Sequence, residues 1–326
     1  MDGSNVTTSD EETRGIDFAS SSDQAQIARL WNSSAGSEFA MSQRLVGSAG
    51  SQAEGVWQSG RFALSDGRLI GMVWVTAAHG LNRDGGLSGF VEILCVVPEF
   101  QGQGVGGRLL AWAEAALAAE GCERVVLGGG FRWPLNCVPR ELGSVDFFRS
   151  SGYVEGKAVW DVVRDLAELD DERRVGDDLG SIVEASESDE AELFEFLRTT
   201  FPRWALELAD HRRAQERMSD YLVVRVDGTL QGFCKLTFED SGRPLERFLG
   251  SPLPRPWGEL GPIGLTESVR GRGLGGALLR ESIFALRAKG VRGCRICWTP
   301  LPGFYETAGF QREREFVMMM KNLDGS

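Results

Sequence analysis

A short glycine-rich segment occurs twice in this chain and constrains its fold more than any other feature. It has the sequence Gln101-Gly-Gln-Gly-Val-Gly-Gly107 in the first copy and Arg270-Gly-Arg-Gly-Leu-Gly-Gly276 in the second. Apolar residues at helical spacing follow each segment, which indicates that each segment begins a helix. The N-terminus of a helix attracts phosphate because its free N–H groups carry partial positive charge, and glycine permits close approach. The sequence therefore predicts two phosphate-binding loops, each leading into a helix.

The similarity between the two copies extends beyond the loops. The loops are offset by 169 residues, and at this offset the match continues to Gly121 and Gly290, where glycine is expected to end each helix. A second matched pair, Phe147–Tyr153 and Phe304–Phe310, follows at an offset of 157 residues, so the first copy carries 12 more residues between the two blocks. Two matched blocks in the same order indicate that a whole domain has been duplicated.

The order of the expected elements defines the fold class. In each copy, helices precede two strands joined by an Asp-Gly turn, and a further strand, the glycine loop, a helix, a strand, a short helix and a last strand follow. This order predicts an α/β fold in which helices flank a mixed sheet, present as two tandem domains. The expected ranges are a disordered tail at residues 1–14, domains at 15–165 and 181–322, and an acidic linker at 166–180.

The charge of the chain limits its partners. The net charge is −12 and the isoelectric point is about 4.9, which argues against nucleic acid or an anionic membrane as the main partner. No apolar run reaches the roughly 18 residues of a membrane-spanning helix. The first residues are polar and acidic, unlike a signal peptide. A cytoplasmic protein without nucleic-acid or membrane partners is therefore expected, and its oligomeric state is left open.

The six cysteines are scattered through the chain, which is typical of reduced thiols. Cys294 and Cys297 have the spacing of metal ligands, but they lie in a short apolar run that is expected to be a strand. Residues three apart on a strand face opposite ways. Because His79 and His211 are the only histidines, no metal site is expected, and the cysteines are interpreted as core residues.

Both loops also contain the pattern G-x-G-x-x-G, at Gly102, Gly104 and Gly107 and at Gly271, Gly273 and Gly276. A dinucleotide-binding fold requires this loop after the first strand and an acidic residue about 20 residues further on. The first loop instead follows roughly a hundred residues, and Leu127 and Ile296 stand near the positions of the acid. The pattern therefore disfavours a nicotinamide-cofactor enzyme.

The pattern Gln/Arg-x-x-Gly-x-Gly, placed after a strand and before a helix, resembles motif A of the GNAT acetyltransferase superfamily. The two aromatic and glycine blocks are similar to motif B, and the tandem arrangement is similar to that of the mycothiol synthase family. The resemblance implies acetyl-CoA as a co-substrate, with its pyrophosphate on the loops. The residues implied in binding it are Leu265, Arg270, Gly271, Arg272, Gly273, Leu274, Gly275 and Gly276 in the second copy, and Gln101, Gly102, Gly104, Gly106 and Gly107 in the first. The arginines predict a firmer hold on phosphate in the second copy.

The same resemblance implies a glutamate on the strand before the loop and a tyrosine in motif B, as base and acid. The second copy has Glu259 and Tyr305 at these positions, whereas the first has Phe90 and Phe148. Acetyl transfer is therefore expected in the second copy, and the first is expected to be degenerate. Two alternatives stay open: Tyr305 as an aromatic core residue, and Glu259 as a solvated acid with a water chain as the base. Pro262 predicts a bulge in the strand of Glu259.

These features predict an N-acetyltransferase that acts on a primary amine of a small molecule. The sequence does not specify the acceptor, and amino sugars, aminoglycosides, polyamines, amino acids and peptide N-termini all remain open. An acyl-CoA-binding sensor or interaction module without turnover is the alternative, since both glycine loops are retained. A proline-rich segment, Glu239–Gly258, leads into the strand of Glu259 and is expected either to line the acceptor pocket or to run over the surface.

Overall fold

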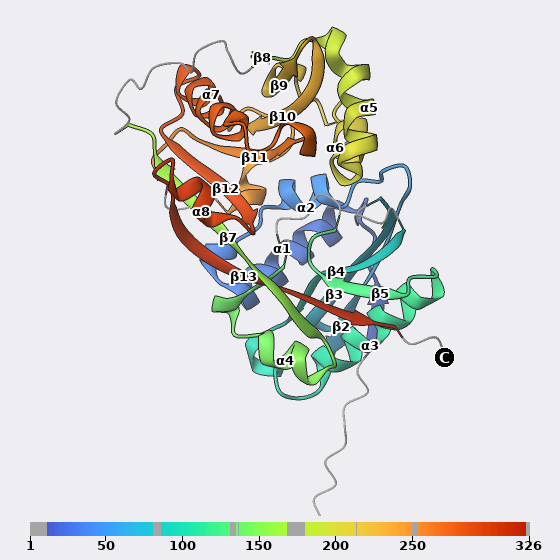
Figure 1. The fold of residues 1–326 in the computed structure, drawn as a ribbon. Coiled ribbons are helices and arrows are strands. Elements are labelled where there is room, and N and C mark those ends of the chain that lie inside the picture. Colours follow the sequence, from blue (N-terminus) through green and yellow to red (C-terminus); the bar gives the residue numbers. More distant parts are fainter. Residues whose placement is uncertain are drawn as a thin grey trace, which may run out of the picture. The chain divides into compact units, whose positions relative to one another are not determined.

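The structure is a computed structural model that describes residues 12–80, 86–130, 135, 137–167, 180–212, 214–249 and 253–323 (Figure 1). The described chain forms two compact units. Unit 1 comprises the described parts of Met1–Ala78, Leu87–Leu135 and Met320–Ser326, and unit 2 those of His79–Gly86 and Asn136–Met319.

Unit 1 contains the first glycine loop and the helix that follows it. Its elements are β1 (Glu12–Gly15), α1 (Ser21–Ala35), α2 (Gln43–Ala49), β2 (Val56–Ser65), β3 (Arg68–His79), β4 (Leu87–Val96), α3 (Val105–Ala119) and β5 (Arg124–Leu127). The strands lie in the order β1-β2-β3-β4-β5, and β4 and β5 are parallel. The last residues of β13, Met320–Asn322, pair with the outer edge of β5. Glu12–Arg14, expected in a disordered tail, instead belong to β1 and pair with β2.

Unit 2 contains the second glycine loop. Its elements are β6 (Val138–Pro139), α4 (Val145–Ser150), β7 (Val154–Asp165), β8 (Ser181–Glu184), α5 (Glu190–Thr200), α6 (Pro202–Ala209), β9 (Tyr221–Val226), β10 (Thr229–Thr237), β11 (Trp257–Leu265), α7 (Leu274–Ala288), β12 (Gly293–Thr299), α8 (Pro302–Glu306) and β13 (Gln311–Asn322). The strand order is β13-β7-β12-β11-β10-β9-β8, and β6 pairs with β13. Figure 1 shows α7 on one side of β9 and β10 and the pair α5 and α6 on the other.

The compact units divide the chain differently from the ranges expected from the repeat. β7 ends the first repeat in sequence, yet it pairs with β12 in the sheet of unit 2, where Cys294 faces Arg164. Leu166, expected in the linker, is buried in the same core, and its N–H donates to Arg292 O at 2.6 Å. Sequence similarity follows the duplication event, whereas compactness follows strand pairing. Residues 168–179 of the expected linker lie outside the described residues.

Two apolar cores cover the two faces of the unit 2 sheet. Leu236, Leu260 and Ile296 pack with the buried face of α7, which includes Leu278 and Leu286. Tyr221, Val223 and Phe233 pack instead with α5 and α6, on the other face. Because side chains alternate along a strand, Glu259 points away from α7, toward the side of α5 and α6. The sequence therefore places the candidate base on the face opposite the loop helix.

β11 contains the predicted bulge. In its pairing with β10, Ile263 lies opposite Cys234 and Leu260 lies opposite Leu236. Two residues of β11, Gly261 and Pro262, thus lie opposite a single residue of β10, Lys235. Proline cannot donate a ladder hydrogen bond, and a bulge accommodates it without leaving a gap in the ladder.

The two cysteines of β12 lie on opposite faces of the sheet. Cys294 packs in the α7-side core and Cys297 against Phe248 on the other face, as expected for positions three apart on a strand. Within the described parts, no group of three or more His, Cys, Asp or Glu side chains is arranged to bind a metal ion. No helix there combines the length and the apolar character needed to cross a membrane.

Candidate active site

The second glycine loop leads from β11 into α7 through two glycines in the left-handed region. Gly271 has φ 74° and Gly273, the N-cap of α7, has φ 86°. Gly102 and Gly104 adopt the same conformation in the first copy, with φ 74° and 83°. Side chains rarely adopt these angles, so glycine is required by the turn itself as well as by close approach of a ligand.

The open side of each loop faces solvent. A Cβ atom built on Gly107 or Gly271 would have no neighbouring atom within 4 Å, and at Gly276 it would meet only the far end of Arg280, at 3.4 Å. Leu274 is different, because its side chain is buried in the α7 core and only its backbone faces the loop. The free N–H groups at the start of α7 are thus accessible to an anion.

The side chain of the first residue of each loop is hydrogen-bonded to the end of the strand that precedes the loop. Arg270 donates from Nε and Nη2 to the carbonyl of Leu265, at 3.1 and 3.0 Å. Gln101 donates from Nε2 to the carbonyl of Val96 at 2.9 Å, the matching contact in the first copy. Two of the three guanidinium nitrogens of Arg270 therefore hold the loop against the preceding strand. Arg272 is exposed on the loop and remains the freer cation for a phosphate.

Glu259 lies on β11 just before the bulge and is only 3% exposed. Thr237 Oγ1 on β10 donates to its Oε2 at a long 3.4 Å. A Cβ built on Gly261 would lie 2.8 Å from Oε1, so the glycine at the bulge leaves room for the carboxylate. Burial raises the pKa of Glu259 well above its ordinary value, and the charges of Arg247 and Lys235 only partly offset this.

The parallel strands that flank this glutamate separate immediately beyond it. β11 and β12 pair from Trp257–Gly293 to Glu259–Arg295, although both strands continue further. In unit 1, β4 and β5 pair with Gly89 opposite Val125, which is the same register at the 169-residue offset. The register thus independently matches Phe90 to Glu259, as the residue count from the loops does.

Tyr305 lies on α8 and is 7% exposed. Its ring packs against Phe304 and Phe310, with centroids 5.0 and 6.2 Å away. Its hydroxyl shares a hydrogen bond with the side chain of Thr299, at the end of β12. Burial raises the pKa of this hydroxyl above its ordinary value, so it stays protonated at neutral pH and can donate a proton. The ring is a core residue, while the hydroxyl points to the strand end where β11 and β12 have separated.

The first copy also carries a buried carboxylate, but it is held differently. Glu92, two residues after Phe90, accepts hydrogen bonds from Thr76 Oγ1 at 2.5 Å and from Gly130 N–H at 3.1 Å. A Cβ on Gly130 would lie only 1.5 Å from Glu92 Oε1. The carboxylate therefore ties β4 to the segment after β5 instead of facing an open space.

A cluster of buried charges lies beside Glu259 on the α5 and α6 side, and no sequence pattern indicated it. Lys235 Nζ lies 2.6 Å from Glu216 Oε1, and Arg243 lies within 3.3 Å of both Glu216 and Glu207. Arg247 Nη2 lies 3.5 Å from Glu207 Oε2. Burial alone would raise the pKa of Glu207, but the surrounding cations lower it to about 2. The residues come from α6, β10 and the segments around them, so only the folded chain brings them together.

The proline-rich segment contributes directly to this region. Leu245, Arg247 and Phe248 from its described part are buried, and Phe248 packs in a small apolar cluster with Trp257. The segment therefore lines the side of Glu259 and does not run over the surface there.

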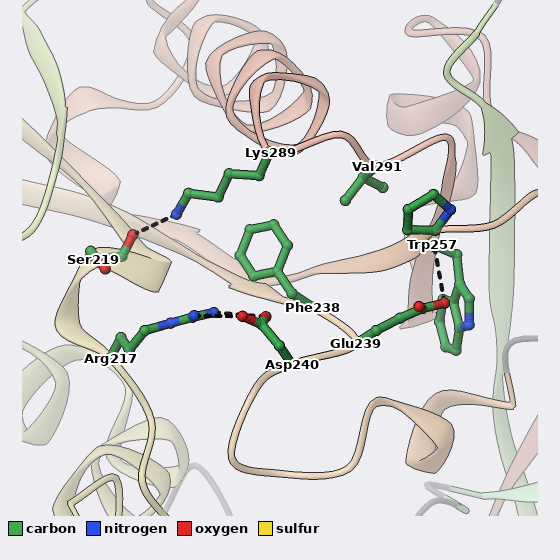
Figure 2. A pocket seen from close by; sticks show the side chains of 9 residues that line it. Arg217, Ser219, Phe238, Glu239, Asp240, Trp257, Lys289 and Val291 are labelled. Atoms are coloured by element: carbon green, nitrogen blue, oxygen red, sulfur yellow. Dashed lines mark hydrogen bonds and ion pairs between the residues drawn. The ribbon is translucent and has the colours of Figure 1, made fainter.

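A separate hollow of about 450 Å³ lies at the other end of α7 (Figure 2). Phe238 forms its floor between the cations of Arg217 and Lys289, which lie 5.9 and 4.8 Å from the ring centroid. Arg217 is paired with Asp240, at 2.8 Å. Lys289 follows the last residue of the 15-residue α7, about 22 Å from the glycine loop at its start. The hollow is therefore distinct from the glycine loop.

Comparison with known proteins identifies the family of this chain. A model described as the acetyltransferase (GNAT) family matches residues 25–153 and 188–310, which is more than half of the chain. The chain belongs to the GNAT acetyltransferase family. The two matched regions confirm the predicted tandem organisation and the α/β class, and family membership implies an acyltransferase that uses an acyl-CoA donor and an acceptor.

Solved structures share the fold of the whole chain. The GCN5-related glucosamine N-acetyltransferase region of a fungal multi-domain GH3 β-N-acetylglucosaminidase is 20% identical, with a TM-score of 0.85, and the match covers 97% of this chain and 38% of that one. A tandem GNAT protein from the clavulanic acid biosynthesis pathway is 16% identical, with a TM-score of 0.69 and coverage of 97% and 100%. A GCN5-related N-acetyltransferase from Sphaerobacter thermophilus is 18% identical, with a TM-score of 0.66 and coverage of 96% and 95%. No curated protein matched.

Proposed function

We propose that the second copy of this tandem GNAT protein transfers an acetyl group from acetyl-CoA to a primary amine of a small molecule. One observation carries the proposal. Glu259 is buried where β11 and β12 separate, the buried Tyr305 hydroxyl bonds to Thr299 at the end of β12, and the loop Arg270–Gly276 follows β11 closely. The matching residues of the first copy, Phe90 and Phe148, have no group that accepts or donates a proton.

The second loop fits the pyrophosphate of acetyl-CoA. Gly271 and Gly276 leave the N-terminus of α7 uncovered, and Arg272 adds a positive charge on the exposed side. Bound acetyl-CoA would supply the acetyl thioester at the far end of its pantetheine arm. The separation of β11 and β12 beyond Glu259 gives that arm a route between the strands.

Glu259 and Tyr305 divide the proton transfers between them. Glu259 accepts the proton that the acceptor ammonium must lose, and a raised pKa makes its carboxylate a stronger base. The amine nitrogen then forms the bond to the acetyl carbon and the carbon–sulfur bond breaks. Tyr305, which burial keeps protonated by raising its pKa, donates its hydroxyl proton to the departing thiolate, and the second proton that leaves the nitrogen restores the hydroxyl.

The first copy serves in this proposal as a structural partner without turnover. Its carboxylate at Glu92 is fixed by Thr76 and by the backbone of Gly130. For the acceptor, the likeness in fold to a glucosamine N-acetyltransferase region makes glucosamine the first amine to test.

The test is release of CoA from acetyl-CoA in the presence of glucosamine, spermidine, an aminoglycoside or an amino acid, with the product identified by mass spectrometry. We expect amine-dependent release with at least one acceptor. Glu259→Gln should lower it by about 10²-fold or more, and Glu92→Gln, the matched change in the first copy, should leave it within about threefold. Tight binding of acetyl-CoA without release for any amine would support the sensor instead.

A further inference from the structure

Trp298 is the bulkiest side chain that the described backbone holds in the left-handed region. Its φ is +53°, whereas Gly129, the matching residue at the 169-residue offset, has φ +76°. The first copy thus places glycine where this conformation is needed, and the second places a tryptophan there. A bulky residue at positive φ is a true outlier, and such strain is concentrated at functional sites.

A bulge holds Trp298 in place. In the pairing of β12 with β7, Ile296 lies opposite Val162 and Thr299 opposite Trp160, so two residues of β12 face Asp161 alone. The N–H of Trp298 donates to Asp161 Oδ1 at 3.1 Å.

Asp161 is itself fixed. It is 1% exposed, and its Oδ2 accepts from Nη1 of the fully buried Arg295 at 2.9 Å. Burial raises the pKa of Asp161 to about 6, and the guanidinium of Arg295 opposes this rise. The backbone of Trp298 therefore rests on a buried ion pair and not on a flexible loop.

The bulge also turns the side chain. Cys294 and Ile296 pack in the α7-side core, and regular alternation would send Trp298 to that same side. Instead both Cys297 and Trp298 pack against Phe248, on the face of Glu259. Bulges next to active sites re-aim side chains in this way.

Two hydrogen-bond donors on this face have no partner among the described residues. One is the indole Nε1 of Trp298, which is buried although part of the side chain is exposed, and the other is the buried Nε of Arg247. They flank one aromatic ring, because the Trp298 and Arg247 side chains lie 6.0 and 4.4 Å from the centroid of Phe248. Unsatisfied buried donors call for an acceptor from outside. Since Glu207 already balances the charge of Arg247, a neutral oxygen is sufficient.

We propose that Trp298 binds the acceptor of the reaction and that this acceptor is an amino sugar. The apolar face of a pyranose ring would stack on the exposed part of the indole. The two side chains would turn so that sugar oxygens accept from the indole N–H and from Arg247, and the amine would point to Glu259. The inference rests on the proposed function of the second copy for the direction of the amine. Its choice of a sugar rests on the pairing of an aromatic surface with unsatisfied donors.

The test uses direct binding as well as turnover, so that the two proposals fail separately. Glucosamine and cyclohexylamine both present a primary amine on a six-membered ring, and only the sugar has hydroxyl groups. Binding of each to the full-length protein saturated with CoA is measured by calorimetry, and acetylation of each is measured by CoA release. We expect glucosamine to bind at least tenfold more tightly and to be the better substrate.

Variants of Trp298 identify the residue responsible. Trp298→Phe keeps a ring but removes the N–H, and we expect about a fivefold to tenfold weaker affinity for glucosamine with no change for cyclohexylamine. Trp298→Ala should weaken glucosamine by about 100-fold, and neither variant should change the Kd for acetyl-CoA. That unchanged Kd, with a cooperative thermal transition, shows that the variants are folded.

Several results would overturn the inference. Equal binding of the two amines by the native protein would exclude the sugar, and undiminished glucosamine binding by Trp298→Ala would exclude the residue. Glucosamine that binds through Trp298 but is not acetylated would leave the inference standing and refute the proposed function.

Discussion

Replacing Tyr305 by phenylalanine removes one oxygen atom, and its effect on stability should be small while its effect on turnover should be large. The aromatic ring and its contacts with Phe304 and Phe310 remain, and the lost interaction is the hydrogen bond with Thr299. A hydrogen bond of this kind contributes about 1 kcal/mol. For a domain of about 150–250 residues this corresponds to a fall in Tm of about 2–4 °C.

The expected loss of turnover is much larger. A missing general acid lowers the rate by about 10²–10⁴-fold, which is about 3–5 kcal/mol in the activation free energy. The affinity for acetyl-CoA should hardly change, because the hydroxyl bonds to Thr299 and not to the phosphate-binding loop. Steady-state CoA release at saturating acetyl-CoA gives kcat, and calorimetry gives the Kd for acetyl-CoA.

Two matched variants control for indirect effects. Tyr221→Phe deletes the same atom from another buried tyrosine of unit 2, on β9, and should leave kcat within about threefold. Phe148→Tyr adds a hydroxyl at the matching position of the first repeat and should not raise it. The reasoning is refuted if Tyr305→Phe retains full turnover, or if Tyr221→Phe loses as much.

Two further predictions concern Glu259 as the base and the strands β7 and β13. Because burial raises the pKa of Glu259 and the base must be ionised, kcat/KM should rise with pH along a limb well above the ordinary range of a carboxyl group, and Glu259→Gln should abolish that limb. The folded state binds this proton more tightly than the unfolded state, so stability from this group is present at low pH and is lost as pH rises through the raised pKa. pH–rate profiles and melting curves of the native protein and of Glu259→Gln test both statements. A rise of kcat/KM in the pH range of an exposed carboxyl group would contradict them. Residues 12–167 and 180–323, expressed separately, should each lack a cooperative melting transition, because β7 belongs to the sheet of unit 2 and β13 pairs with β5. Co-expression should restore the transition, whereas a fully active fragment 180–323 would show that β7 is dispensable.

Local sequence determined the parts of the fold that depend on local rules. The glycines at 102, 104, 271 and 273 mark left-handed turns before two helices, and Pro262 marks the bulge in β11. The duplication allowed the strand register of one copy to be compared with that of the other, because both copies keep the same spacing between the strand and the loop. The placement of β7 was missed, since a strand's partner depends on contacts distant in sequence. Periodicity alone would place β7 with the repeat that encodes it.

The surroundings of the candidate base were also beyond the sequence. Lys235 lies on β10, Glu207 on α6 and Arg247 in the proline-rich segment, and nothing in their spacing indicates that they come together. The conformation of Trp298 could not be predicted, because no local pattern indicates a positive φ at a tryptophan. One signal was present, because Trp298 matches Gly129 at the 169-residue offset. A glycine in one repeat indicates that the matching position of the other repeat can have a positive φ.

The most direct test of the central proposal, that the second copy binds acetyl-CoA and performs the transfer, is a matched pair of loop variants. Gly276→Asp and Gly107→Asp each place a carboxylate in the open space at a helix N-terminus, where a negative charge does not destabilise the helix. Turnover and the Kd for acetyl-CoA are measured for both. We expect Gly276→Asp to weaken acetyl-CoA binding by at least 100-fold and to remove turnover, and Gly107→Asp to leave both within about threefold. The reverse pattern, with activity lost in Gly107→Asp and kept in Gly276→Asp, would assign the chemistry to the first copy and contradict the account.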